Sequence, residues 1–143
     1  MLNESAETGY IASVRGLLAQ AVLEQGRNEE ALRIAEETRR MSAPDDHEPH
    51  ARASAVRARA LALAGDLAGA ERAIAEAEEI AAPTEYLPLR TFVALARAEV
   101  EHAAARPKGE REALEEAVRL SELKGDVVSG QAARARLAAL SAT

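Results

Sequence analysis

A pattern of two helical stretches joined by a short turn occurs three times along the 143-residue chain. This repetition limits the possible folds more than any other feature. Placing Gly26 over Gly65 and Ala105 aligns three long–short pairs of helical stretches at offsets of 39 and 40 residues. A further turn follows each pair. A period of this length is typical of folds in which helical hairpins stack on one another, because a single hairpin cannot bury its apolar face alone.

Turn-forming residues divide the chain into seven expected helices. Glycine or alanine ends one helix, and Asn, Asp, Thr or a first-turn proline opens the next. No segment alternates apolar and polar residues convincingly enough to predict a strand. We therefore expect an all-α domain, a solenoid of three helical hairpins followed by a C-terminal capping helix. The expected helices span about residues 5–25, 28–42, 46–64, 67–82, 85–104, 107–124 and 127–141.

Alanine dominates the composition, with 35 copies against 29 for Leu, Ile, Val and Phe combined. A core of this kind depends on the close approach of helices more than on bulky side chains. Apolar residues recur at helical spacing, so each helix is expected to bury one stripe. The predicted stripes contain Val14, Leu17, Leu18, Ala21 and Val22 in the first helix, Ala70, Ile74 and Ala77 in the fourth, and Leu114, Ala117 and Val118 in the sixth.

Small residues follow the turns at fixed distances. In the second hairpin, Ala70 lies five residues after Gly65, and Ala77 lies seven residues further on. Ala31 and Thr38 occupy the same two places in the first hairpin. This pattern resembles the tetratricopeptide repeat (TPR) over most of the chain. The resemblance implies a solenoid of helical hairpins that binds other proteins.

The third hairpin departs from the TPR pattern, because Ala105 replaces the glycine and Glu110 stands where the alanine belongs. A shift of three residues sets Ala113 over Ala31 instead, so two registers remain open. The large aromatic residues of the family are missing, and the period exceeds the family's usual length of about 34 residues, which implies longer helices. Within one expected domain, 1–143, the repeats span about 10–45, 46–84 and 85–124, and the cap spans 126–141.

Two segments carry a narrower resemblance. The stretch Gly9–Glu37 is similar to the C-terminal helical repeats of large actinobacterial regulators, and Leu114–Ala133 resembles the closing repeat and cap of such arrays. Those proteins join an ATPase module, and sometimes a cyclase or a LuxR-type DNA-binding domain, to a TPR array. The resemblance implies that this chain is a C-terminal piece of such a regulator and holds none of its catalytic residues.

The first helix of each hairpin forms the concave face of a stacked array, and that face is the expected binding surface. Its mixture of polar, charged and apolar residues suits a peptide or a helix of a partner protein. The sole phenylalanine, Phe92, can equally be a core residue. The repeat register places these partner-binding residues on the concave face: Gln20, Glu24, Arg52, Arg59, Phe92, Glu99 and His102.

One binding mode of the TPR family grips a C-terminal carboxylate with lysine, asparagine and arginine at set positions of three repeats. This sequence does not carry that set, so a receptor for chaperone tails is disfavoured. The positions read Gly16, Gln20, Val56, Phe92 and Ala96, with Leu95 and Glu99 in the last two places under the shifted register.

One short segment has the composition of a metal site, since His47 and His50 accompany three carboxylates between Asp45 and Glu48. Zinc needs three or four converging ligands. Acidic N-capping of a helix that starts at Asp46, with solvent-exposed histidines, explains the segment better. A further histidine, His102, stands in a helix with no serine or cysteine nucleophile near it in sequence. We therefore predict no catalytic, cofactor-binding or metal-binding residue.

Charge and composition also limit the partners. The formal net charge is −6, and the 16 arginines and two lysines are dispersed among glutamates, which disfavours nucleic acid. No run of about 18 apolar residues predicts a membrane-spanning helix. The absence of cysteine fits a reducing cytoplasm.

The function expected from these features is protein–protein interaction or scaffolding, in a regulatory setting and without enzymatic activity. Two alternatives stay open. One is a sensor domain whose groove holds a peptide or a small molecule. The other is a structural array whose exposed apolar end pairs with a second copy as a homodimer.

Overall fold

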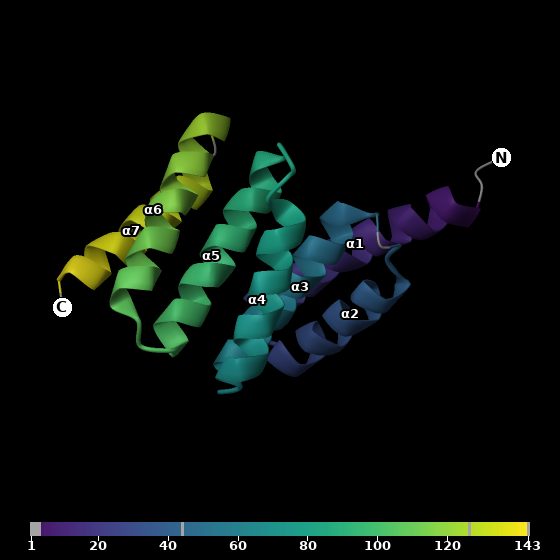
Figure 1. The fold of residues 1–143 in the computed structure, drawn as a ribbon, viewed down its shortest axis with the longest axis horizontal. Helices are drawn as coiled ribbons and strands as arrows, with labels where there is room; N and C mark the ends of the chain where they lie inside the picture. The colour runs from purple at the N-terminus through teal and green to yellow at the C-terminus, as the bar shows by residue number, and fades with distance from the viewer. Residues whose placement is uncertain (1–3, 44, 126, 143) are drawn as a thin grey trace.

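The computed structural model describes residues 4–43, 45–125 and 127–142, and within these ranges the protein is all-α, with seven helices and no strand (Figure 1). The all-α prediction is confirmed, and each helix begins and ends within two residues of its expected bounds. Residues 44 and 126, which belong to an expected turn and to the expected start of the cap, lie outside the described ranges. The helices are α1 (Glu4–Glu24), α2 (Asn28–Met41), α3 (His47–Leu63), α4 (Leu67–Ala81), α5 (Leu87–Ala103), α6 (Pro107–Lys124) and α7 (Val127–Ser141).

The helices form a row of hairpins. Within the row, α1 packs on α2, α3 on α4, and α5 on α6. Each later hairpin also touches the one before it, since α3 contacts both α1 and α2, and α5 contacts both α3 and α4. The last helix, α7, packs on α6, so that α1 and α7 lie at opposite ends of the molecule (Figure 1). This stacking is the arrangement expected of a helical-hairpin solenoid.

The turn inside each hairpin has the same backbone geometry. Gly26, Gly65 and Ala105 all adopt positive φ angles, of 81°, 87° and 56°. Glycine populates this left-handed region freely, whereas alanine is strained there. In each turn the next residue donates its N–H to a carbonyl five residues back, which satisfies an orphan carbonyl at the helix end. These hydrogen bonds join Arg27 to Val22, Asp66 to Leu61, and Arg106 to Glu101.

The shared turn decides between the two registers of the third hairpin. Because Ala105 matches Gly26 and Gly65 in backbone conformation, Glu110 is the counterpart of Ala31 and Ala70, and the shift of three residues is wrong. Only 6% of the surface of Glu110 is exposed, so a carboxylate occupies a place that alanine fills in the other two hairpins. The second small position of each hairpin is fully buried, as Thr38, Ala77 and Ala117.

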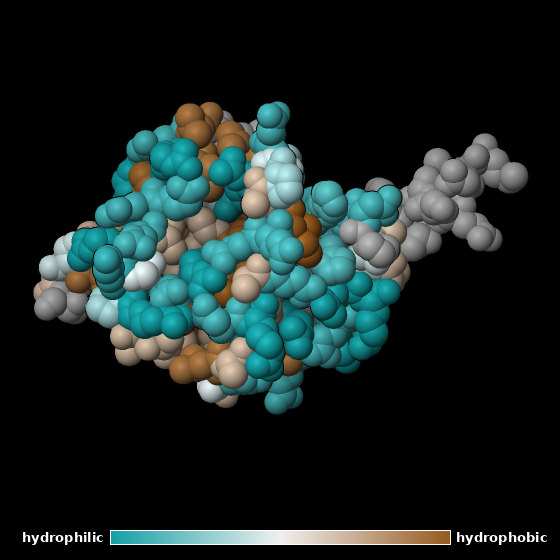
Figure 2. Space-filling model, viewed as in Figure 1, coloured by the Kyte–Doolittle hydropathy of each residue, from teal (hydrophilic) through white to brown (hydrophobic). Residues whose placement is uncertain are grey.

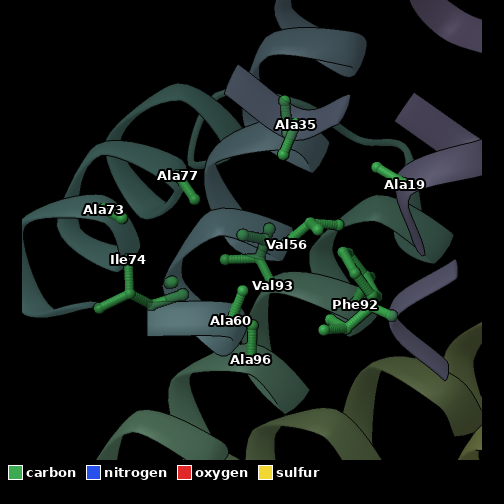
Figure 3. Close-up of a cluster of buried hydrophobic side chains, with 14 of the residues drawn as sticks. Ala19, Ala35, Val56, Ala60, Ala73, Ile74, Ala77, Phe92, Val93 and Ala96 are labelled. Carbon is green, nitrogen blue, oxygen red and sulfur yellow. The ribbon is translucent and has the colours of Figure 1, made fainter. Parts of the chain in front are cut away.

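Small side chains fill most of the core. The main cluster joins α1 to α5, and two smaller clusters connect α5, α6 and α7. Figure 3 shows alanines from several helices pointing toward a few larger residues such as Val56, Ile74 and Phe92. Because alanine lets helices approach closely, the hairpins pack tightly with little bulky apolar surface. Ala70, Ile74 and Ala77 are buried as predicted in α4, and Leu114 and Ala117 in α6.

The predicted stripe of α1 is wrong in most of its members. Apart from Val22, its residues are exposed, with 53% of Leu17 and 46% of Leu18 accessible. The buried side of α1 is the one that faces α2 and α3, whereas its other side faces no described helix. The exposed residues are Ile11, Val14, Leu17, Leu18 and Ala21, and the buried ones are Ala12, Gly16, Ala19, Val22 and Leu23.

Candidate functional site: a groove lined by α1, α3, α5 and α7

A cavity of about 510 Å³ lies on the side of the row formed by α1, α3, α5 and α7. These are the first helices of the three hairpins, together with the cap. The opposite side, formed by α2, α4 and α6, presents a largely hydrophilic surface (Figure 2). Six of the seven predicted partner-binding residues line the cavity: Gln20, Glu24, Arg52, Arg59, Phe92 and Glu99. Its other lining residues are Leu17, Tyr86, Pro88, Thr91, Leu95, Ser129, Ala132 and Arg136. We call this cavity the groove.

Phe92 is the aromatic centre of the groove. The guanidinium carbons of Arg52 and Arg59 each lie 5.5 Å from the centroid of its ring, within the range of a cation–π contact. The two arginines are seven residues apart on α3, so they project from the same face two turns from each other. Only 7% of the surface of Phe92 is exposed, and the residue also belongs to the main core. The ring therefore fixes both arginines while it closes the groove floor.

Arg52 is a buried cation whose donors are largely used. Its Nε donates to Oε1 of Glu48 at 2.7 Å, and its Nη1 donates to Oε1 of Gln20 at 2.6 Å. Since Gln20 lies on α1, the second bond ties the first hairpin to the second. With 5% of its surface exposed, Arg52 holds the groove wall in place more than it offers a contact to a ligand.

Arg59 is less committed than Arg52. Its Nε donates to Oε2 of Glu99 at 2.8 Å, which joins α3 to α5. Among the described residues, this is the only protein hydrogen bond of Arg59, so the edge formed by its two terminal nitrogens is not occupied by a described side chain. Such an edge is the part of arginine that binds a carboxylate with two parallel hydrogen bonds.

His102, the seventh predicted residue, does not line the groove. It lines a neighbouring hollow of about 490 Å³ with Glu110, Ala139 and Leu140. The side chain of His102 is 74% exposed, and its Nδ1 lies 3.2 Å from Oε2 of Glu110. Both hollows are also lined by Glu99 and Arg136.

Arg136 and Tyr86 are groove residues that the sequence reasoning missed. Arg136 lies on α7, and its Nη2 is 3.7 Å from Oε1 of Glu110, an ion pair too long for a hydrogen bond. Tyr86 precedes α5 and is half exposed. The cap was expected only to cover the last hairpin, although its composition carries a signal. Val127–Ser141 contains two arginines and no acidic residue.

The histidine-rich segment before and within α3 is not assembled into a metal site in the part of the chain that is described. His47 is exposed, whereas Nε2 of His50 lies 3.3 Å from Oε1 of Glu76 on α4. Asp46 occupies the N-cap position of α3, but it makes no side-chain capping hydrogen bond, so the predicted capping role is wrong. Burial by the fold and the neighbouring carboxylates of Glu48 and Asp45 raise the pKa of Asp46.

Glu76 joins three helices away from the groove. It accepts hydrogen bonds from Nε and Nη2 of Arg39 on α2, at 3.1 Å and 2.7 Å, and from the hydroxyl of Ser54 on α3 at 3.2 Å. Burial raises the pKa of the Glu76 carboxyl, but the hydrogen bonds from Arg39, His50 and Ser54 outweigh burial and lower it overall.

A second ionic cluster is centred on Arg97 of α5. Nε of Arg97 donates to Glu78 at 3.0 Å, and its Nη1 donates to Glu71 at 2.9 Å and to Glu101 at 3.1 Å. Arg106 bonds to Glu101 and Glu71 as well. The hydrogen bond from Arg97 lowers the pKa of Glu71, although burial acts against it. This cluster ties α4 to α5, and its partners are all supplied by the protein itself.

Comparison of the chain with protein-family models, curated proteins and solved structures finds no match. The TPR resemblance therefore rests on the sequence pattern alone and stays a prediction. None of the described helices combines the length and the apolar content that crossing a lipid bilayer requires.

Proposed function

We propose that this protein is a TPR-like interaction module that binds a peptide or a helix of a partner protein in the groove. The observation that carries the proposal is the groove itself, to which each hairpin contributes its first helix. Its lining combines exposed apolar residues such as Leu17 and Tyr86 with charged residues such as Arg59 and Glu24. Apolar anchors beside polar groups are the usual composition of a protein-binding surface.

Binding is a better proposal than catalysis for this groove. The polar groups at its centre pair with one another, Arg52 with Glu48 and Arg59 with Glu99. We place the module in a cytoplasmic signalling or transcriptional regulator, on the strength of the sequence resemblance and the lack of cysteine.

Site-specific photo-crosslinking tests the groove as the binding surface. A photoreactive phenylalanine analogue replaces Tyr86, a half-exposed aromatic residue that lines the groove, so the substitution adds little bulk there. A matched variant carries the analogue at Ala75, exposed on α4. After irradiation in an extract of the cells that produce the protein, we expect a discrete protein adduct at position 86 and none at position 75. Adducts at both positions alike, or at position 75 only, would contradict the proposal.

Two alternatives have a specific observation each. The groove volume of 510 Å³ lies within the range of small-molecule sites, which favours a sensor. A single metabolite that strongly raises the melting temperature in a thermal-shift screen would support a sensor.

The exposed apolar stripe of α1 favours self-association. Light scattering over a dilution series tests that alternative, because a monomer at every concentration removes it.

A further inference from the structure

Positive and negative charge are distributed unequally between the two sides of the solenoid. The groove-lining helices α1, α3, α5 and α7 carry eight arginines and six glutamates. The outer helices α2, α4 and α6 carry eight basic residues and thirteen glutamates. Several of the eight arginines pair with glutamates of the outer helices, among them Arg15, Arg57, Arg90 and Arg97. The groove lining itself carries three arginines, Arg52, Arg59 and Arg136, against two glutamates, Glu24 and Glu99. In a chain of net charge −6, this local excess of positive charge favours anionic groups in the groove.

Two of the groove arginines have terminal nitrogens that donate no hydrogen bond to a described residue. Within the part of the chain that the structure describes, Arg59 uses only Nε in hydrogen bonding, and the one ion pair of Arg136 is the long one with Glu110. Arg59 lies on α3 and Arg136 on α7, so the two reach the groove from different walls. Each is partly buried, with 16% and 33% of its side chain exposed, which strengthens a charge-assisted hydrogen bond relative to a fully exposed arginine.

Apolar contact sites accompany these cations. Leu17 is 53% exposed and Tyr86 is 50% exposed, and both line the groove together with the partly exposed Leu95. A ligand that places a carboxylate on the arginines can therefore bury an apolar side chain against the same wall. The apolar contact supplies affinity, and the ion pairs select the charge of the ligand.

We propose that the groove selects an acidic and apolar peptide segment, in which a glutamate or aspartate side chain binds Arg59 and Arg136 while a neighbouring apolar residue packs on Leu17, Tyr86 and Leu95. This inference rests on the proposed function and names the chemistry of its ligand. A monoanionic carboxylate fits better than a phosphate dianion, because Glu24 and Glu99 line the same cavity and repel a second negative charge.

A peptide library displayed on phage tests the inference. The displayed peptides have no free C-terminus, so any enriched carboxylate belongs to a side chain. We expect the full-length protein to enrich segments with Glu or Asp beside Leu, Ile or Phe. Binding of the selected peptides, measured with synthetic amidated copies, should weaken by about tenfold or more in Arg59→Gln/Arg136→Gln, since both ion pairs are lost. A higher salt concentration should also weaken binding of the selected peptides to the wild-type protein, because salt screens the ion pairs.

Matched variants separate charge selection from loss of the groove. Arg33→Gln/Arg72→Gln removes the same charge from the outer helices, where both arginines are exposed, and should change affinity by less than about twofold. Ala132→Trp fills the groove without a change of charge and should abolish binding, while Ala75→Trp on α4 should not. Circular dichroism checks that each variant is folded. If the double variant fails to fold, Arg136→Gln alone, on the more exposed arginine, should still weaken binding by about threefold.

The possible outcomes are distinct. In one outcome, Ala132→Trp no longer binds the selected peptides, but the peptides lack acidic enrichment or bind the arginine variants as well as the wild type. That outcome would overturn the charge preference and leave the groove as a binding site. Peptides that bind Ala132→Trp as well as the wild type, or a library that yields no binder, would overturn the proposed function and this inference together.

Discussion

At the scale of single residues, one strained alanine shows how the repeat persists without its usual amino acid. Ala105 takes a φ of 56° where its counterparts Gly26 and Gly65 have φ angles above 80°. The stacking of the third hairpin holds this backbone in place, although alanine in the left-handed region costs about 1–2 kcal/mol. The alignment of the three turns could be predicted from sequence because it depends on local residues. The register of the third hairpin could not, because it is decided by the backbone conformation of Ala105.

Ala105→Gly is therefore expected to stabilise the protein. Relief of backbone strain exceeds the entropy that glycine adds to the unfolded chain, so the free energy of unfolding should rise by about 0.5–1 kcal/mol. The neighbouring Ala104 has an ordinary negative φ of −84°, so Ala104→Gly should lower the free energy of unfolding by about 0.5–1 kcal/mol. Urea unfolding measures both changes. A destabilised Ala105→Gly would show that the strain is not present in solution.

The hydrogen bonds that Arg39, His50 and Ser54 make to Glu76 predict that the stability of the protein depends on pH. Because the folded protein holds the pKa of Glu76 below its ordinary value of 4.5, this carboxylate contributes stability above that pH and loses the contribution as the pH falls through the lowered value. Arg39→Gln removes the strongest partner of Glu76. The destabilisation it causes should be largest at neutral pH and should shrink below about pH 4.5. Urea unfolding at several pH values checks this.

Arg40→Gln is the control for that series, since Arg40 is the exposed neighbour of Arg39 on α2. It should change stability little at any pH. An Arg39→Gln effect that is independent of pH would mean that the ion pair with Glu76 is not formed.

At the scale of single helices, α1 shows where periodicity alone fails. Two apolar stripes with the same helical spacing run along α1, one through Val14 and Leu18 and one through Ala19 and Leu23. Periodicity predicts that an amphipathic helix exists, but it cannot choose between two such stripes. The choice depends on which side meets α2 and α3, and this is a tertiary contact. In α4, by contrast, only one stripe is apolar, and its burial was predicted correctly.

A matched pair of leucines in α1 tests this assignment. Leu23 is 4% exposed and belongs to the main core, whereas Leu18 is 46% exposed. Leu23→Ala should cost about 2–5 kcal/mol of unfolding free energy, because it opens a cavity. Leu18→Ala should change that free energy by less than about 0.5 kcal/mol. The reverse order of effects in urea unfolding would mean that α1 presents its other face to the core.

At the scale of the whole molecule, the groove is a product of stacking. Six of its residues could be predicted because one repeat register places the same side of α1, α3 and α5 on the concave face. Arg136 could not be predicted, because the contribution of α7 depends on how the cap sits on α6. His102 was misplaced by the same register, since it lies beyond the groove beside Glu110.

Removal of α7 should therefore affect binding and stability together. A chain that ends after Gly125 loses the packing of Ala133 on Ala117 and Leu120, and it also loses one groove wall. In a stacked array each interface between repeats contributes separately to the stability of the protein. We therefore expect a lower midpoint of urea unfolding, with helicity retained in the remaining hairpins. Circular dichroism measures both quantities. Complete loss of helicity would show that the hairpins do not behave as a stacked array.

The side of the molecule formed by α1, α3, α5 and α7 is the proposed binding surface. NMR mapping on the ¹⁵N-labelled protein, titrated with the tightest peptide from the library, tests it most directly. We predict that shifted amides cluster around Arg59, Phe92 and Ala132, while those of α2 and α4 stay unchanged. Shifts confined to the outer helices, or to the exposed stripe of α1, would show that the peptide binds elsewhere and that the groove is not the binding surface.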